Sequence, residues 1–256
     1  GFNPLIAHAH DITMARACVA DWPESAHVLA HEFWPGPLTL VLPRSTIIPD
    51  IVTGGLDTVG VRIPLPLVAR SLIAALGRPL AAPSANRSNG ISPTLAGHVA
   101  SDLGDRVDLI LDSGQTTVGL ESTVLDLTTR EPRVLRPGPI TAERIEHVLG
   151  GLRVREADGD TAAVDQPLSS PGQMAIHYAP RTPAVRVRDG AELASSPDGW
   201  LDRSALIVIG PHTLPEFLPM PPANRFVLDT PAIAARDLYV VLHQADALGV
   251  ERIVVL

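Results

Sequence analysis

The sequence predicts an α/β protein with a mixed sheet, followed by a second and smaller α/β domain. Three observations lead to this prediction. The chain has 256 residues, of which 45% are hydrophobic and 19% charged, an ordinary globular composition with enough apolar residues for a large core. Short apolar runs alternate with helical patterns in some places and follow one another at hairpin spacing in others, which favours a mixed sheet. Residues 154–182 then break this regularity.

Strands in the first part are expected where β-forming residues cluster and a Pro, Gly or polar turn ends the run. Helices are expected where apolar residues recur at steps of three and four. Trp34-Pro35-Gly36-Pro37 ends one such helix, and Thr94 and Thr141 are the expected caps of two others. The expected strands are 38–42, 58–64, 80–82, 107–112, 121–127 and 134–138, and the expected helices are 13–19, 24–33, 66–76, 94–103 and 142–149.

The second part begins after a segment rich in Gly, Ser, Pro and acidic residues, a composition typical of a linker or lid. His177, Tyr178 and Arg181 lie within it, which is unusual for a plain linker. Strands at 205–210 and 252–256, with a helix at 233–248, predict a small Rossmann-like α/β domain. The expected division is therefore a first domain at 1–152, a linker at 153–183 and a second domain at 184–256. The chain is expected to be truncated at both ends, since it begins abruptly and ends on a strand.

Charge and composition exclude several classes of function. The net charge is −8 and all 20 basic residues are Arg, which argues against broad nucleic-acid binding and excludes lysine-based mechanisms. Cys18 is the single cysteine, so a multi-cysteine metal site is excluded, and no apolar run approaches the roughly 18 residues of a membrane span. The chain carries no Walker loop, no G-x-G-x-x-G and no H-E-x-x-H motif. We expect a cytoplasmic protein, and we assign no residue as a metal ligand.

Residues 79–94 form the most informative loop of the sequence. Two prolines, a glycine and several Ser, Asn, Arg and Thr residues follow an apolar lead-in, so backbone N–H groups and hydroxyls are available to an anion. The same residues would also suit a rigid surface loop that caps its own turns. Local chemistry alone leaves both interpretations open.

Two arginines at strand ends favour the anion-binding interpretation. Arg62 and Arg136 each follow apolar residues, and a guanidinium beside a core needs an anion as its partner. With the hydroxyls of Ser84 and Ser122 they could bind a molecule with two anionic groups. His8 alone would more often be a structural histidine. The pattern indicates a site for a phosphorylated or carboxylated small molecule.

Seven motifs, in order and at intact spacing, closely resemble the YrdC-like family of L-threonylcarbamoyl-AMP synthases over most of residues 1–183. They are Asn3-Pro4-Leu5-Ile6-Ala7-His8, Trp34-Pro35-Gly36-Pro37-Leu38-Thr39, Val61-Arg62-Ile63-Pro64, Ala82-Pro83-Ser84-Ala85-Asn86, Ser92-Pro93-Thr94, Glu121-Ser122-Thr123-Val124 and Leu135-Arg136-Pro137-Gly138. His177-Tyr178-Ala179-Pro180 resembles the linker of the two-domain members.

The resemblance implies a YrdC-like twisted sheet and a nucleotidyltransferase that forms threonylcarbamoyl-AMP and pyrophosphate from L-threonine, bicarbonate or CO2, and ATP, with Mg²⁺. A partner transferase would then modify a tRNA adenosine. By resemblance, the residues that contact the threonine or its carbamate are His8, Arg62, Ala82 and Ser122. Those that contact the nucleotide are Asn3, Thr58, Ser84, Ser92, Arg136 and Tyr178. No residue is assigned as a nucleophile or as a catalytic acid or base.

One departure and two alternatives accompany this expectation. The family's P-T-E-T-like turn and K-x-R-P motif, which would precede Asn3, do not occur here, so these residues alone are expected to have little or no synthase activity. A related carbamoyl-adenylate enzyme, as in carbamoyltransferases and hydrogenase maturation, would keep the fold with another acceptor. A non-catalytic module that binds double-stranded RNA or tRNA is the other alternative, which the net charge of −8 and the lack of Lys disfavour.

Overall fold

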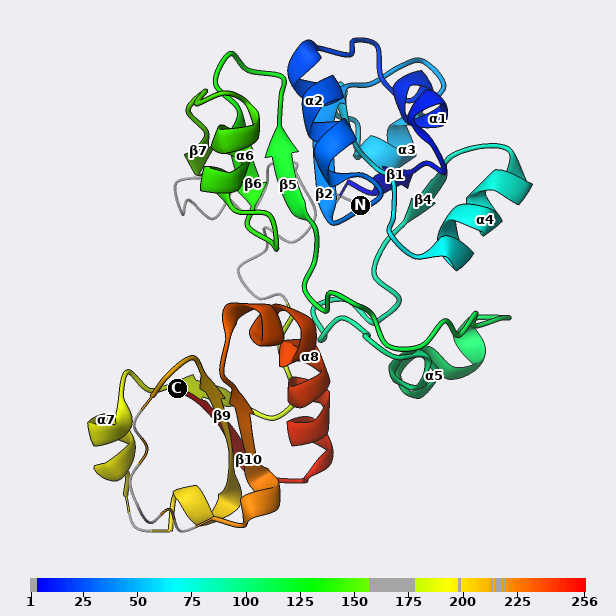
Figure 1. The fold of residues 1–256 in the computed structure, drawn as a ribbon. Helices are drawn as coiled ribbons and strands as arrows, with labels where there is room; N and C mark the ends of the chain where they lie inside the picture. Colours follow the sequence, from blue (N-terminus) through cyan, green and yellow to red (C-terminus); the bar gives the residue numbers. More distant parts are fainter. Residues whose placement is uncertain (1–3, 157–177, 198, 213, 215–217, 219) are drawn as a thin grey trace. The chain divides into compact units, whose positions relative to one another are not determined.

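A computed structural model describes residues 4–156, 178–197, 199–212, 214, 218 and 220–256. The chain forms two compact units, each built from two segments (Figure 1). Unit 1 comprises Gly1–Pro83 and Glu121–Ala175, and unit 2 comprises Ser84–Leu120 and Ile176–Leu256. Residues 84–120, which lie inside the first domain expected from the sequence, thus pack with the C-terminal half of the chain.

Unit 1 is built on a seven-stranded mixed sheet in the order β4-β1-β3-β2-β5-β6-β7. Its parallel pairs are β1 with β3, β2 with β5 and β6 with β7, while β1 with β4, β2 with β3 and β5 with β6 are antiparallel. The strands are β1 (Ile6–His8), β2 (Leu38–Pro43), β3 (Thr58–Arg62), β4 (Leu80–Ala82), β5 (Thr123–Asp126), β6 (Arg133–Arg136) and β7 (Arg155–Glu156). The mixed sheet expected from the sequence is confirmed.

Helices cover one face of this sheet and form the main core with it. Leu29 and Phe33 of α2 and Ile145 of α6 pack there against strand residues such as Leu40 and Val61. The helices of unit 1 are α1 (Ile12–Ala17), α2 (Glu24–Phe33), α3 (Asp50–Thr53), α4 (Leu67–Leu76) and α6 (Ala142–Val148). Because side chains alternate along a strand, the residues between these core positions point to the opposite face.

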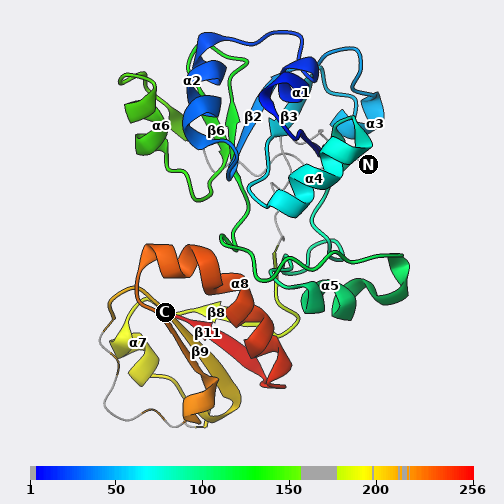
Figure 2. The ribbon, with the colours of Figure 1, turned by 45° about the vertical axis from the view of Figure 1, so that its right-hand side comes forward.

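Unit 2 contains a four-stranded, all-parallel sheet in the order β10-β9-β11-β8. The strands are β8 (Ala184–Arg186), β9 (Ser204–Ile209), β10 (Arg225–Leu228) and β11 (Arg252–Val255). In β9, Ala205 and Ile207 belong to the core shared with α8 (Pro231–Ala247), and Leu206 and Val208 belong to the core shared with α7 (Gly190–Ala194). The two helices therefore cover opposite faces, as expected for a small Rossmann-like domain (Figure 2).

The segment 84–120 carries α5 (Ala96–Leu103) and the 3₁₀ turn η1 (Gly104–Arg106); the other 3₁₀ turns are η2 (Leu201–Arg203) and η3 (Pro222–Asn224). Two expectations fail in this segment. Residues 107–112 form no strand, and Leu109 and Leu111 in them are 74% and 51% exposed. Thr94 does not cap α5, whose N-cap is Leu95 without a side-chain bond; the Thr94 hydroxyl lies 3.3 Å from Nδ1 of His98 instead.

The other helices and strands predicted from the sequence lie within two residues of their expected bounds. Helix α2 has the expected bounds, and Thr141 caps α6 by accepting a hydrogen bond from the backbone N–H of Arg144. Across the described residues, the structure contains no helix that combines the length and the apolar character needed to span a membrane.

Candidate functional site

The face of the unit 1 sheet opposite α2 and α6 carries the polar side chains singled out in the sequence. His8 ends β1 and is the register partner of Arg62, which ends the parallel strand β3. Thr39 lies near the start of β2, Ser122 immediately precedes β5, and Arg136 ends β6. Strand direction therefore gathers these five residues at one edge of the sheet.

Arg62 is the most informative member of this group. In the part of the chain that the structure describes, its Nε donates to the Gly36 carbonyl at 2.9 Å, and its guanidinium forms no ion pair with a carboxylate. Burial lowers the pKa of Arg62 to about 10, and the positive charge of Arg136 contributes to the shift. Two guanidinium groups close enough to repel each other favour the binding of an anion.

Arg136 is held by a chain of buried hydroxyls. It donates to the Ser122 carbonyl from Nε at 3.1 Å and from Nη2 at 2.9 Å, and Nη2 lies 3.0 Å from the Ser122 hydroxyl. The Ser122 hydroxyl in turn lies 2.8 Å from the Thr39 hydroxyl. Thr39 is fully buried and Ser122 is 1% exposed, so these bonds fix the guanidinium in a low-dielectric setting.

Two glycines permit the close approaches on which this geometry depends. A Cβ at Gly138 would lie 2.4 Å from the backbone nitrogen of Thr123, so only glycine lets the turn after Arg136 pass the start of β5. A Cβ at Gly36 would lie 2.1 Å from the Phe33 carbonyl oxygen. Gly36 thereby keeps the turn that presents its carbonyl to Arg62.

His8 is neutral at physiological pH. Burial lowers its pKa from 6.5 to about 4, and the positive charge of Arg62 adds to the shift. Among the described residues its Nδ1 has no hydrogen-bond partner, although the atom is buried. A neutral imidazole beside a guanidinium offers a ligand one polar contact without adding charge.

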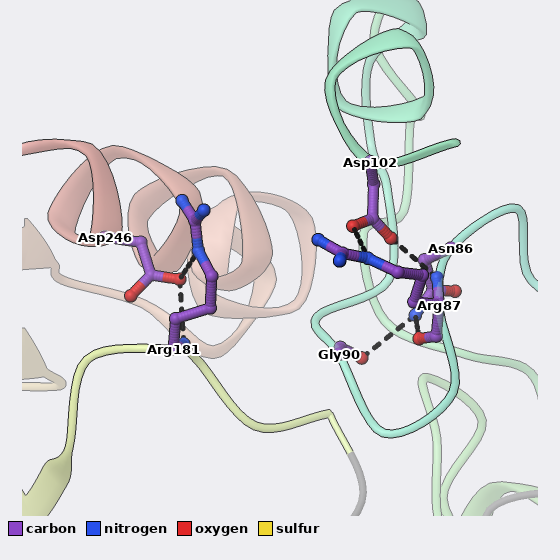
Figure 3. Close-up of polar contacts among 6 residues, drawn as sticks. All are labelled: Asn86, Arg87, Gly90, Asp102, Arg181 and Asp246. Carbon is purple, nitrogen blue, oxygen red and sulfur yellow. Dashed lines mark hydrogen bonds and ion pairs between the residues drawn. The ribbon is translucent and has the colours of Figure 1, made fainter. Parts of the chain in front are cut away.

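The polar loop of residues 84–94 belongs to unit 2. Figure 3 shows two ion pairs of this unit, and one of them joins Arg87 of the loop to Asp102. Asp102 of α5 accepts the backbone N–H of Arg87 at 2.6 Å and its Nε at 2.7 Å. Asn86 closes the loop by donating to the Gly90 carbonyl at 3.0 Å. Arg181 similarly uses its backbone N–H to bind Asp246 of α8, at 2.9 Å. The loop is thus fixed by side chains from its own unit.

The other predicted site residues fall in several places. Thr58 lies on the same face as Arg62 at the opposite end of β3, and Ala82 of β4 pairs with Ile6, two residues from His8. Ser84, Ser92 and Tyr178 belong to unit 2, where Ser92 is 6% exposed and the Tyr178 ring lies 5.9 Å from that of Tyr239. Asn3 lies outside the described residues.

The roles of Thr39, Gly36 and Gly138 were not predicted from the sequence, although each residue lies in one of the seven motifs. The features that could have indicated these roles are a hydroxyl within an apolar run and two glycines beside prolines. Within the described part of the chain, no three His, Cys, Asp or Glu residues are placed to hold a metal ion. The arrangement can bind and orient an anionic molecule, and it contains no activated nucleophile among the residues at this edge.

Two family models match the chain. The model described as "Telomere recombination", for the Sua5, YciO and YrdC proteins, matches residues 2–138. The model described as "Threonylcarbamoyl-AMP synthase, C-terminal domain" matches residues 140–256.

Curated relatives and solved structures agree with these models. A threonylcarbamoyl-AMP synthase of Pyrococcus abyssi is 39% identical over 97% of this chain and 73% of its own length. One of Bacillus subtilis is 46% identical over 71% of this chain and 52% of its own length, so the chain spans about half of that relative. The crystal structure of P. abyssi Sua5 complexed with L-threonine matches with a TM-score of 0.82 and 38% identity, covering 99% of this chain and 74% of that one.

Proposed function

Because the chain belongs to the Sua5, YciO and YrdC family of threonylcarbamoyl-AMP synthases, we propose that it is such a synthase. It is a nucleotidyltransferase-type enzyme that forms threonylcarbamoyl-AMP and pyrophosphate from L-threonine, bicarbonate or CO2, and ATP. The observation that carries the proposal is Arg62, a partly buried guanidinium beside Arg136 that has no carboxylate partner among the described residues. The carboxylate of an amino acid would supply the missing charge.

The chemistry requires no nucleophile from the protein. The threonine amine adds to CO2 and loses a proton to give a carbamate, and a carbamate oxygen then attacks the α-phosphate of ATP and displaces pyrophosphate. The protein supplies orientation and charge compensation. In this proposal Arg62 pairs with the threonine carboxylate, neutral His8 and the Ser122 hydroxyl contact the amino acid, and Arg136 compensates phosphate charge.

Mg²⁺ enters the proposal as the counter-ion of the ATP triphosphate, and no residue of this chain is assigned to it. A partner transferase would pass the threonylcarbamoyl group to a tRNA adenosine. A cytoplasmic location, supported by the single cysteine Cys18, is also part of the proposal. Ala82, on the strand next to β1, is still predicted to contact the threonine or its carbamate.

Calorimetric titration with L-threonine, and with L-serine for comparison, tests the proposal. We expect threonine-selective binding that weakens about tenfold or more in Arg62→Gln, because a charge-assisted hydrogen bond contributes about 1.5–3 kcal/mol. Arg133→Gln is the matched control, since Arg133 is an exposed arginine of the same sheet. Equal affinities for threonine in both variants would contradict the assignment of Arg62.

A second measurement separates the synthase from a carbamoyltransferase-like enzyme. Any pyrophosphate that the chain releases from ATP should require both threonine and bicarbonate. Release that depends on carbamoyl phosphate and not on threonine would overturn the proposed substrate.

A further inference from the structure

Helix α8 of the C-terminal region is tied to the polar loop of residues 84–94 and to the segment that follows it. At the far end of that segment, the backbone N–H groups of Gly119 and Leu120 both donate to the Ala235 carbonyl of α8, at 2.9 and 3.1 Å. A Cβ at Gly119 would lie 2.4 Å from the Arg236 carbonyl oxygen, so the contact requires glycine. Gln115 adds a hydrogen bond to Asp237 at 3.1 Å.

The loop itself contributes to the core of the same helix. Ile91 is 5% exposed and packs in a cluster that includes Tyr239, Leu242 and Ala245 of α8. On its other side, the Asn89 carbonyl accepts the backbone N–H of Ala179 at 2.9 Å. The centre of the loop is therefore anchored by apolar burial and by a backbone hydrogen bond.

His243 of α8 then fixes the residue that follows Ile91. Its Nε2 lies 3.2 Å from the Ser92 carbonyl oxygen, which can only accept, so Nε2 carries the proton and donates. The His243 ring stacks on the His98 ring of α5, with centroids 3.8 Å apart and planes at 28°. The hydrogen bond thus comes from a ring whose orientation is itself restrained.

His98 completes the arrangement on the side of α5. Its Nδ1 accepts the backbone N–H of Thr94 at 3.3 Å, which requires that Nδ1 be unprotonated. Burial, with a contribution from His243, lowers the pKa of His98 and keeps the ring neutral. The two stacked rings therefore bind the backbone on both sides of Pro93, one as donor and one as acceptor.

We infer that His243 is a positioning residue for nucleotide binding, through which the C-terminal domain holds the Ser92 loop in its ATP-binding conformation. The inference rests on the proposed function and on the role that the family resemblance implies for Ser84 and Ser92, which is contact with the nucleotide. The C-terminal domain would then have a role in the reaction, because α8 would hold the polar loop of residues 84–94 in the conformation that binds the nucleotide.

Two substitutions at position 243 test the inference. His243→Phe keeps an aromatic ring to stack on His98 and loses the donor, whereas His243→Gln keeps an N–H donor and loses the ring. We expect the ATP dissociation constant of H243F, measured by calorimetry on the full chain, to rise about tenfold, as loss of one hydrogen bond predicts. H243Q should stay close to the wild-type value. His212→Phe, at an exposed histidine of the same unit, is the matched control.

The threonine dissociation constant provides the internal reference. It should remain at the wild-type value in H243F, because a general loss of folding would weaken both ligands. Hydrogen exchange without any ligand provides an independent measure: amides of residues 88–95 should lose protection in H243F and keep it in H243Q. Unchanged exchange of these amides would overturn the inference.

The outcomes also separate this inference from the proposed function. Failure of the wild-type chain to bind ATP would contradict the proposed function and the nucleotide role of the loop. ATP binding by the wild-type chain, with the same constant in H243F, would overturn the positioning role of His243 alone.

Discussion

At the scale of single residues, the candidate site depends on polar groups that a packed sheet would ordinarily exclude. Thr39, Ser122 and Arg136 are buried and bonded to one another, and Arg62 is left beside them without a carboxylate within the described residues. Burying a charge is costly unless an anion pairs with it. In the proposed function, the substrate would supply a negative charge at this position and so offset the free-energy cost of burying the guanidinium.

The partly buried His8 predicts a pH dependence of stability. Its pKa is about 4 in the folded protein and 6.5 for an unperturbed histidine, so between these values the unfolded chain binds the extra proton. Stability is therefore complete above about pH 6.5 and falls as the pH drops toward 4, by about 3 kcal/mol from this group. Urea unfolding at about pH 7 and about pH 4 should show a smaller loss for His8→Gln than for the wild type. Equal losses would contradict this account.

Thr39 offers a second test at the scale of one hydroxyl. Thr39→Val keeps the volume but leaves the buried Ser122 hydroxyl with one partner fewer, which should cost about 1–3 kcal/mol of unfolding free energy. Thr39→Ser keeps the hydroxyl and should cost less. Denaturant unfolding of the two variants measures the difference; a valine variant as stable as the serine variant would be inconsistent with the hydroxyl chain.

At the level of single residues, the two arginines of the candidate site could be singled out from the sequence, whereas the residues that hold them in place could not. Arg62 and Arg136 stand out because charges at the ends of apolar strands need partners. Thr39 does not stand out, since a threonine in a strand is ordinary and its partner is 83 positions away. The hydrogen bond between His243 and the Ser92 carbonyl could not be predicted either, because His243 is one of several polar residues in the helical pattern of α8.

At the scale of elements, the turn after β6 determines where Arg136 lies. Gly138→Ala would bring a Cβ to within 2.4 Å of Thr123 and 2.7 Å of the Glu121 carbonyl oxygen, so the turn must move. We expect a loss of about 1–3 kcal/mol in unfolding free energy, the usual cost of overpacking. Gly97→Ala in α5, where a Cβ meets open space, should be neutral or stabilising by up to about 1 kcal/mol. Similar stabilities of the two variants in denaturant unfolding would contradict the close approach at Gly138.

Elements with strong local signals were predictable, and one with a misleading signal was not. The apolar run of β2 and the pattern of α2 gave the right type and nearly the right bounds. Residues 107–112 are rich in Val, Leu and Ile, as a buried strand is, yet no neighbouring strand pairs with them among the described residues. An apolar run reports the compatibility of a segment with a sheet, and a strand also needs a partner.

At the scale of the whole molecule, each of the two units is built from two segments that are not consecutive in the chain. A fragment of residues 140–256 would lack Ile91 and Leu120, which pack against α8 in unit 2. We expect this fragment to bind an apolar dye such as anilinonaphthalene sulfonate and to self-associate, because part of the core of α8 would be exposed. Fusing residues 84–120 to it through a flexible linker should reduce both effects, as fluorescence and size-exclusion chromatography would show. A monomeric fragment that binds no dye would contradict the shared core.

This discontinuity could not be predicted from the sequence. Composition changes near residue 154, and the division expected there follows that change. The pairing of residues 84–120 with α8 depends on contacts between positions more than 100 apart, such as Gln115 with Asp237. Local periodicity carries no information about such contacts.

The Gly119 contact restricts how this protein can be recombined with its relatives. A chimaera joined near residue 139, where one family model gives way to the other, would combine a Gly119 segment from one parent with an α8 from another. A Cβ at Gly119 would lie 2.4 Å from the Arg236 carbonyl oxygen, so the segment and the helix make contact through their backbones. The segment from one parent must therefore fit the backbone of α8 from the other. Positions 119 and 236 should therefore be inherited together, although the junction lies between them.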